Sequence, residues 1–277
     1  MAVTWRKDLD YWMIQKAIEK GAEVWDRAVV KGLTSGGNTC SITVKRQGVT
    51  QALAPRFVVG ADGTNSTIRR LVFPELHATY TIAYRECYEG SLDLEQKNGY
   101  VVFPSGDYRP NFWILPKGGC FTLEGGLRSL KGEIRDILTP RGFQEGRPLW
   151  KDGCLSRVQL PGHPFPDAET SVRGNVLLAG DAARLKIPVS GEGIGTALRS
   201  GILAAESIAA SLTSGKEVSN IFANELRPLL VTLHTFYLDL GQIKTDARKG
   251  PQALLDAVTR AFEKTMDPIR PLHGNST

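Results

Sequence analysis

One stretch, residues 175–206, limits most strongly what this chain can fold into. A short apolar run from Val176 ends at Gly180-Asp181, and Pro188 precedes a glycine-rich turn, Gly191–Gly195. An alanine-rich pattern with helical spacing follows. This order predicts a strand, a loop, a tight turn and the start of a helix. A helix N-terminus offers unpaired N–H groups and a positive dipole end, which favour an anion or an electron-rich atom. An ordinary strand-to-helix turn is the alternative.

The same stretch resembles a flavin-contacting motif of the geranylgeranyl reductase family, a group of FAD-dependent oxidoreductases with the aromatic-hydroxylase type of fold. The family pattern is GDAA, a short gap, and then P-x-[ST]-G-E-G-I. The matching positions are Gly180, Asp181, Ala182, Ala183, Pro188, Ser190, Gly191, Glu192, Gly193 and Ile194.

Two further segments match the family in the expected order. Val58 to Arg70 contains the sequence GADGTNSTIRR, which is similar to the family's GADGxxSxxR segment. A looser match joins Arg6, Leu9-Asp10 and the run from Gly21 to Val24. The resemblance implies that Arg6, Asp62 and Gly63 contact the cofactor, with Arg6 on its phosphate side.

The resemblance also implies how FAD is held. The pyrimidine edge of its ring would lie against the turn formed by Gly191, Glu192, Gly193 and Ile194. Backbone N–H groups there would stabilise negative charge when the flavin is reduced. Asp181, next to Gly180, would bind the sugar or phosphate side, with Asp62 nearby, and Pro188 would set the shape of the loop.

The chain departs from the family at its start. Members begin with a strand and a GxGxxG turn that holds the FAD pyrophosphate. No GxGxxG occurs in this sequence. We therefore expect either a shortened chain or a partner polypeptide that supplies the dinucleotide-binding unit.

Composition excludes several classes of protein. The formal charge is only +5 and is spread along the chain, which is compatible with anionic cofactors or a membrane surface but does not indicate nucleic acid. Neither a signal peptide nor a membrane-spanning run is visible. We expect a cytoplasmic protein, with peripheral membrane contact as an open alternative. The dispersed cysteines (Cys40, Cys87, Cys120 and Cys154) and histidines (His77, His163, His234 and His273) lack metal-ligand spacing.

The hydropathy pattern predicts a mixed α/β fold. Residues 8–21 have helical spacing, residues 22–30 and 39–44 alternate as strands, and a turn at 35–38 joins these strands. Thr64 or Asn65 is the expected cap of a helix that carries Arg69 and Arg70. We expect a Rossmann-like, FAD-binding parallel sheet from residues 1–75 and 171–214. Residues 76–170 should form an antiparallel substrate domain, and residues 215–277 a helical region.

Within the antiparallel region, residues 110–117 resemble the family's Tyr-x-Trp-x-Phe-Pro segment. Trp113 and Pro116 match, whereas Asn111 and Leu115 replace the Tyr and the Phe. The resemblance implies that Trp113 and Pro116 line the substrate cavity. From the residues alone, we expect Trp113 to be a core residue of the sheet. An apolar cluster at residues 229–240 is expected to form a helix that covers this sheet. The alternative is that the cluster faces a membrane or gives access to a lipid.

These observations favour an FAD-dependent oxidoreductase that reduces carbon–carbon double bonds of an isoprenoid or other lipid by hydride transfer. The electron donor would be NAD(P)H or a small redox protein. No side chain stands out as a proton donor. The alternatives are a flavin-dependent monooxygenase or halogenase-like enzyme, and an inactive remnant or subunit that needs a partner to complete its FAD site.

Overall fold

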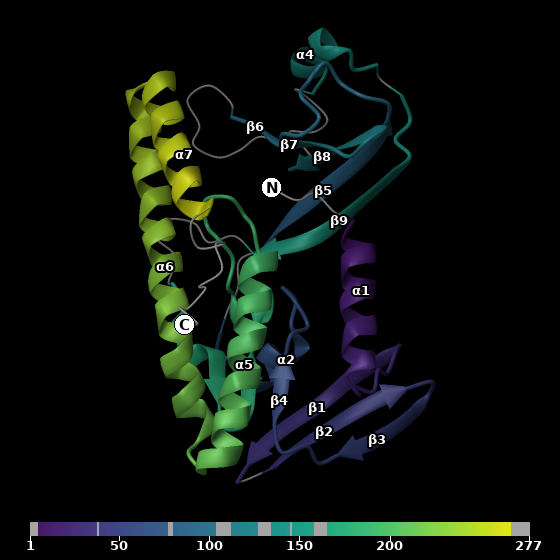
Figure 1. Cartoon of the computed structure of the whole chain (residues 1–277), viewed down its shortest axis with the longest axis vertical. Coiled ribbons are helices and arrows are strands. Elements are labelled where there is room, and N and C mark those ends of the chain that lie inside the picture. Colours follow the sequence, from purple (N-terminus) through teal and green to yellow (C-terminus); the bar gives the residue numbers. More distant parts are fainter. Residues whose placement is uncertain are drawn as a thin grey trace, which may run out of the picture.

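A computed structural model describes residues 5–37, 39–76, 80–103, 112–126, 134–144, 146–157 and 165–266. Figure 1 shows three groups of elements: a small sheet at one end, a larger sheet at the other, and long helices along one side. Asn111 and the histidines at 77, 163 and 273 lie outside the described residues.

The first sheet is an antiparallel meander of β1 (Ala28–Gly36), β2 (Thr39–Arg46) and β3 (Val49–Leu53). The predicted hairpin is confirmed, because Gly36 pairs with Thr39. The second turn has positive φ at Gln47 (50°) and Gly48 (84°), as two-residue hairpin turns of type I′ require. The expected strand at residues 22–30 starts later than predicted, at Ala28.

The second sheet joins the two strongest motifs. β4 (Val58–Gly60) pairs in parallel with β11 (Val176–Leu178), and β10 (Val172–Arg173) lies antiparallel on the other side of β11. Gly60 leaves room for α2 (Thr67–Val72), because a Cβ at this position would lie 2.7 Å from the side chain of Ile68. The two predicted ligand-binding loops, which follow β4 and β11, therefore begin at the carboxyl ends of neighbouring parallel strands.

The third sheet is antiparallel throughout, as expected, with the order β6-β7-β8-β5-β9. Its strands are β5 (Tyr80–Glu89), β6 (Tyr100–Val102), β7 (Phe112–Pro116), β8 (Cys120–Gly125) and β9 (Trp150–Arg157). One face packs with α4 (Ile134–Leu138) around Phe112, Leu123 and Leu138, and all three are fully or almost fully buried. After α4 the chain continues as a short 3₁₀ turn, Thr139–Arg141.

Three helices follow β11: α5 (Ile194–Ser214), α6 (Val218–Asp246) and α7 (Pro251–Met266). They run side by side along one flank of the molecule (Figure 1). α6 buries Leu229, Leu230, Leu233 and Phe236 in the large core that also contains β4 and β11. The apolar cluster at 229–240 is thus mainly a core face that packs toward α5, α7, β10 and β11. None of the helices in the described part of the chain is long and apolar enough to span a membrane.

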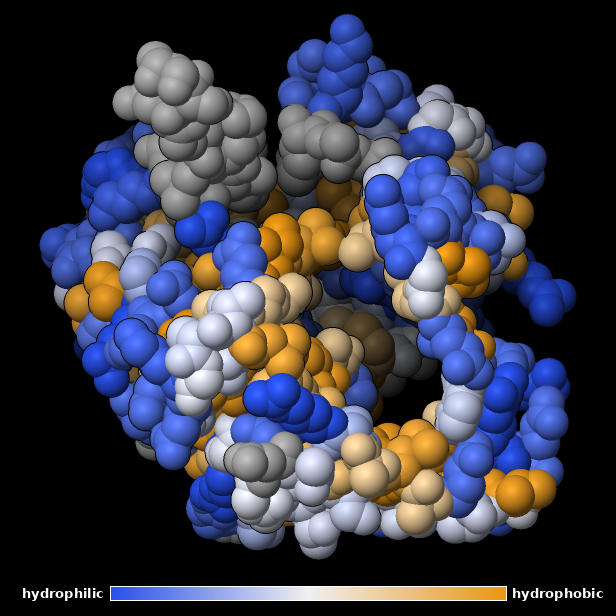
Figure 2. Space-filling view, turned by 60° about the horizontal axis from the view of Figure 1, so that its bottom comes forward, coloured by the Kyte–Doolittle hydropathy of each residue, from blue (hydrophilic) through white to orange (hydrophobic). Residues whose placement is uncertain are grey.

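The first helix is different. α1 (Arg6–Glu19) confirms the predicted helix, but none of its residues is buried. Tyr11 and Trp12 are 65% and 57% exposed. Figure 1 shows α1 standing beside the body of the molecule, between β9 and the meander sheet. In Figure 2 this side of the molecule is hollowed, with hydrophobic residues on parts of the rim.

Candidate functional site

The site begins where the loops after β4 and β11 meet. The Thr64 hydroxyl donates a hydrogen bond to Asp181 Oδ2 over 2.7 Å. Thr64 belongs to the loop after β4, and Asp181 to the 3₁₀ turn η3 (Gly180–Ala183) that follows β11. Ligands in open α/β sheets bind beyond the carboxyl ends of the strands, which is where these two residues lie. The structure therefore brings the two sequence motifs into direct contact.

Arg69 holds the two loops together from inside. Its side chain is 2% exposed. One guanidinium nitrogen donates to the carbonyl oxygens of Asp181 (3.2 Å) and Ala182 (2.9 Å), and the other donates to Thr64 O (2.7 Å) and Tyr80 Oη (3.1 Å). A buried charge has a high desolvation cost unless its hydrogen-bonding groups are satisfied. Four acceptors meet that need here, so Arg69 has a structural role that the sequence motif marked but did not explain.

Asp62 has a local role in the structure. Its carboxylate accepts hydrogen bonds from the backbone N–H groups of Thr67 (2.7 Å) and Ile68 (3.1 Å), and from the Ser66 hydroxyl. Ser66 in turn caps α2 by accepting from the Arg69 N–H at 2.8 Å. The expectation that Thr64 or Asn65 caps this helix is wrong. Asp62 instead supports the loop geometry, and the adjacent Gly63 provides the left-handed φ of 78°.

Gly180 fixes the distance between η3 and α5. Its φ is +56°, and a Cβ at this position would lie 2.9 Å from the Cβ of Ala197. Its N–H donates to the buried Ser200 hydroxyl on α5 at 2.9 Å. Both the backbone conformation and the close helix contact therefore require glycine.

The loop before α5 folds back on itself around Pro188. The N–H of Ile187 donates to Glu192 O (2.9 Å), and the N–H of Gly191 donates to Ile187 O (2.8 Å). Glu192 Oε1 then accepts from the Gly195 N–H at 2.7 Å, so this carboxylate caps the first turn of α5. Its other oxygen, Oε2, is buried and has no hydrogen-bond partner in the described part of the chain.

Some backbone N–H groups remain open at this turn. Among the described residues, those of Gly193, Ile194 and Thr196 have no hydrogen-bond acceptor, and of these three residues only Thr196 is buried. They lie at the start of a 21-residue helix. Asp181 is close by, because a Cβ on Gly193 would lie 3.3 Å from Asp181 Oδ1. Gly193 and Ile194 thus provide two donors at the positive end of a helix dipole, which fits the electron-rich edge of a flavin ring.

Three predicted residues lie elsewhere. Arg6 forms an exposed ion pair with Asp10 one helical turn away (3.0 Å). Trp113 and Pro116 belong to β7, where buried and half-buried positions alternate. Pro116 therefore lies on the buried face with Phe112, whereas Trp113 lies on the opposite face with Leu115. The structure does not bring Trp113 and Pro116 together on one wall.

The face of the five-stranded sheet that carries Trp113 also has charged residues that sequence reasoning missed. Arg85 on β5 forms a two-point ion pair with Asp152 on β9, at 2.9 and 2.7 Å. Hydrogen bonding to Asp152 raises the pKa of Arg85. Lys186, in the loop between η3 and α5, donates to Ser156 Oγ on β9 at 2.7 Å. An alternating strand pattern alone does not show which partner strand supplies such contacts.

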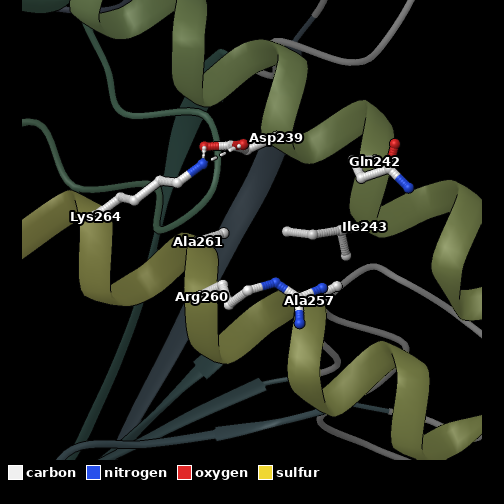
Figure 3. Close-up of a pocket in the computed structure, with 7 residues that line it drawn as sticks. All are labelled: Asp239, Gln242, Ile243, Ala257, Arg260, Ala261 and Lys264. Carbon is white, nitrogen blue, oxygen red and sulfur yellow. Dashed lines mark hydrogen bonds and ion pairs between the residues drawn. The ribbon is translucent and has the colours of Figure 1, made fainter.

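A separate small pocket lies between α6 and α7 (Figure 3). In Figure 3 Lys264 reaches toward Asp239, and the two form an ion pair at 2.9 Å. None of the sequence-predicted site residues lines this pocket. No group of three potential metal ligands occurs within the described ranges.

Comparison with known proteins identifies one matching domain and several relatives. Residues 1–89 match a family model described as an FAD binding domain. The chain is 27% identical to digeranylgeranylglycerophospholipid reductase 1 of Methanococcoides burtonii, over 96% of this chain and 72% of that protein. It is 31% identical to geranylgeranyl diphosphate reductase of Rhodobacter capsulatus, over 76% of this chain and 54% of that protein.

Solved structures show the same fold. A geranylgeranyl bacteriochlorophyll reductase-like protein of Thermoplasma acidophilum superposes with a TM-score of 0.65 at 17% identity, over 95% of this chain and 75% of that one. The flavin-dependent halogenase CmlS gives 0.67 at 16% identity, over 94% of this chain and 51% of that one.

Residues 1–89 therefore match an FAD-binding domain, and the chain as a whole shares the fold of the solved flavin-dependent enzymes. Its homologues include proteins named as geranylgeranyl reductases, which confirms the resemblance drawn from the motifs. The chain spans about half the length of several of these relatives, 54% in the case of the R. capsulatus protein.

Proposed function

We propose that this protein uses FAD to reduce carbon–carbon double bonds of an isoprenoid lipid. The contact of Thr64 with Asp181, reinforced by Arg69, is the observation that supports it most. It joins the glycine turn and the loop after β4 at the carboxyl ends of two parallel strands, the position at which open α/β sheets bind their ligands. Bound FAD would supply the hydride, and the named relatives act on geranylgeranyl substrates.

In this proposal the residues of the site have distinct roles. The N–H groups of Gly193 and Ile194 face the electron-rich ring edge, and Gly191 and Pro188 shape the loop that presents them. Asp181 binds the sugar or phosphate side of the cofactor. Residues 1–75 and 171–214 form the FAD-binding domain, residues 76–170 the substrate domain with Trp113 in its cavity, and residues 215–277 a helical region.

The FAD site needs one more structural unit. β4 is the terminal strand of its sheet within the described residues, and Val59 on it is 41% exposed. Parallel sheets are normally covered on both faces, and an uncovered edge strand can pair with a further strand. We propose that a βαβ dinucleotide-binding unit, on the same or another polypeptide, adds a strand to β4 and covers the exposed Tyr11 and Trp12 of α1. That unit would hold the FAD pyrophosphate.

Flavin binding is tested by adding FAD to the purified chain and following the flavin absorbance and fluorescence. Quenched fluorescence and a shifted absorbance spectrum support the proposal. The same titration is repeated with a separately produced βαβ unit taken from a full-length relative. An unchanged flavin spectrum in both mixtures would contradict the FAD proposal.

The reaction is tested anaerobically with the FAD-loaded protein and a geranylgeranyl lipid. Dithionite, NADPH or a reduced ferredoxin serves in turn as the electron donor. Mass spectrometry should show the lipid gaining two hydrogens for each double bond reduced. Reduction with NADPH or ferredoxin would identify the physiological class of donor.

A second candidate is oxygen-dependent hydroxylation or halogenation. It is favoured by the fold shared with OxyS anhydrotetracycline hydroxylase (TM-score 0.63) and with the halogenase CmlS. Substrate-dependent oxygen consumption, with an oxygen or halogen atom added to the product, would support it. A product formed only without oxygen would exclude it.

A further inference from the structure

Lys186 crosses the glycine turn and reaches the five-stranded sheet. Its Cε and Cγ lie 3.7 and 4.0 Å from the place that a Cβ on Gly193 would occupy. Its ammonium group ends at Ser156 on β9, 2.7 Å from the hydroxyl oxygen. Ser156 pairs in register with Thr81 on β5, the strand next to β9. Lys186 therefore places a positive charge between the candidate cofactor turn and the sheet opposite it.

Lys186 has no direct carboxylate partner among the described residues. Among the described residues, Lys186 takes part in no ion pair within 4.0 Å. The two carboxylates near the turn each use one oxygen in another contact: Asp181 Oδ2 accepts from Thr64, and Glu192 Oε1 accepts from the Gly195 N–H. The recorded partner of Lys186 is a neutral hydroxyl. A half-buried cation with a neutral partner keeps a strong field, because the surrounding protein screens it less than water does.

The Lys186 side chain has a flexible aliphatic stem. Four methylene groups let the ammonium move by a few ångströms, and its three N–H bonds can be shared between two acceptors. Its Ser156 partner is held by the pairing of β9 with β5. The ammonium can thus keep its bond to Ser156 and also point toward a group that lies on Gly193.

We propose that Lys186 provides the positive charge that stabilises an anionic flavin ring at the turn of Gly193 and Ile194. This inference rests on the proposed function and names a cofactor-contacting residue that the motifs do not include. Lys186 would act with the two open N–H groups, since all three donors lie at the same end of α5. Its effect should be larger on the reduced, negatively charged flavin than on the neutral oxidised flavin.

The test compares Lys186→Met and Lys186→Arg with the unchanged chain. Lys216→Met is the control, since Lys216 is an exposed lysine just beyond the far end of α5. The probes are FAD and riboflavin, because riboflavin has the ring without the phosphates. The dissociation constant of the oxidised probe is measured by fluorescence quenching. The midpoint potential of the bound probe is measured by anaerobic dye-coupled titration.

For Lys186→Met we expect reduced flavin to bind about tenfold more weakly, while oxidised flavin changes less than threefold. For a two-electron couple this lowers the midpoint potential of the bound flavin by about 30 mV. Lys186→Arg should stay near the potential of the unchanged chain, as should Lys216→Met. Thermal melts check that all variants are folded.

An unchanged potential in a folded, flavin-binding Lys186→Met protein would overturn the role of Lys186 and leave the proposed function standing. Equal weakening for both redox states would also overturn it, because that result indicates a structural contact. Failure of the unchanged chain to bind either probe, with the βαβ unit present, would overturn the proposed function and this inference together.

Discussion

The hydroxyl of Thr64 and the carboxylate of Asp181 are joined by a 2.7 Å hydrogen bond across 117 positions of sequence. This bond fixes the loop after β4 against the turn after β11. The N–H of Gly180 is fixed to Ser200 on α5 at the same time. The two loops and the start of α5 therefore form one rigid corner, and the residues that hold it can be tested separately.

Replacing Arg69 should strongly destabilise this corner. Arg69→Ala removes four hydrogen bonds, including those to the buried carbonyl oxygen of Ala182 and the half-buried carbonyl oxygen of Thr64. We expect a loss of about 3–4 kcal/mol in the free energy of unfolding. Arg70→Ala is the matched control, because Arg70 is exposed and bonds only to Asn65 and Thr67. Urea unfolding followed by circular dichroism measures both, and equal losses would contradict the prediction.

Gly180 should tolerate no side chain. Gly180→Ala forces a left-handed φ on alanine and brings its Cβ to 2.9 Å from that of Ala197. We expect destabilisation by about 2–4 kcal/mol. Gly201→Ala is the control on α5, where an added Cβ meets nothing within 4 Å. That control should stabilise the protein by about 0.5–1 kcal/mol. Thermal melting compares the stability of the two variants. An unchanged melting temperature for Gly180→Ala would contradict the prediction, because it would show that the contact with Ala197 relaxes easily.

Glu192 should stabilise the first turn of α5. Glu192→Ala removes the acceptor of the Gly195 N–H and a negative charge near the helix N-terminus. We expect a loss of about 1 kcal/mol. Glu192→Gln keeps an acceptor oxygen and should lose less, and the exposed Glu206→Ala should change little. Denaturant midpoints compare the three variants. A Glu206→Ala loss as large as that of Glu192→Ala would argue against capping.

The cysteines should differ sharply in reactivity. Cys87 is 1% exposed, and burial, with a smaller contribution from Cys120, raises its pKa to about 11. The thiolate is the reactive form, so Cys87 should resist alkylation at pH 8. Cys154 is exposed and should react first with iodoacetamide. Mass spectrometry of peptides after timed labelling gives the order, and early labelling of Cys87 in folded protein would disprove it.

Ionisation of the Tyr84 hydroxyl should lower the stability of the folded protein at high pH. Burial and a hydrogen bond from its hydroxyl to Glu86 Oε1 (2.8 Å) raise its pKa to about 12. The pKa of Tyr84 in the folded protein lies above its value near 10 in the unfolded chain. Its contribution to the free energy of unfolding is therefore complete below pH 10 and is lost as the pH rises toward 12. Tyr84→Phe should have a flatter stability profile between pH 10 and 12. Identical profiles would contradict this assignment.

Local patterns were sufficient to predict several elements. The turn at residues 35–38 predicted a hairpin because hairpin geometry depends on adjacent residues. The antiparallel sheet expected within residues 76–170 was likewise predicted from short-range alternation along each strand. In contrast, the cap of α2 was assigned to Thr64 or Asn65, whereas Ser66 and Asp62 perform it. Several polar residues competed for the role, and only the path of the backbone decides between them.

The sequence by itself determined the glycine turn, the strand that precedes it and the helix that follows. Backbone conformation and capping are short-range effects, so the order of residues is enough to predict them. Only the tertiary structure decided that Arg69 is buried under both loops, that Trp113 and Pro116 face opposite ways, and that Lys186 reaches Ser156. Those relations depend on which distant strands pack together, and no local pattern contains that information.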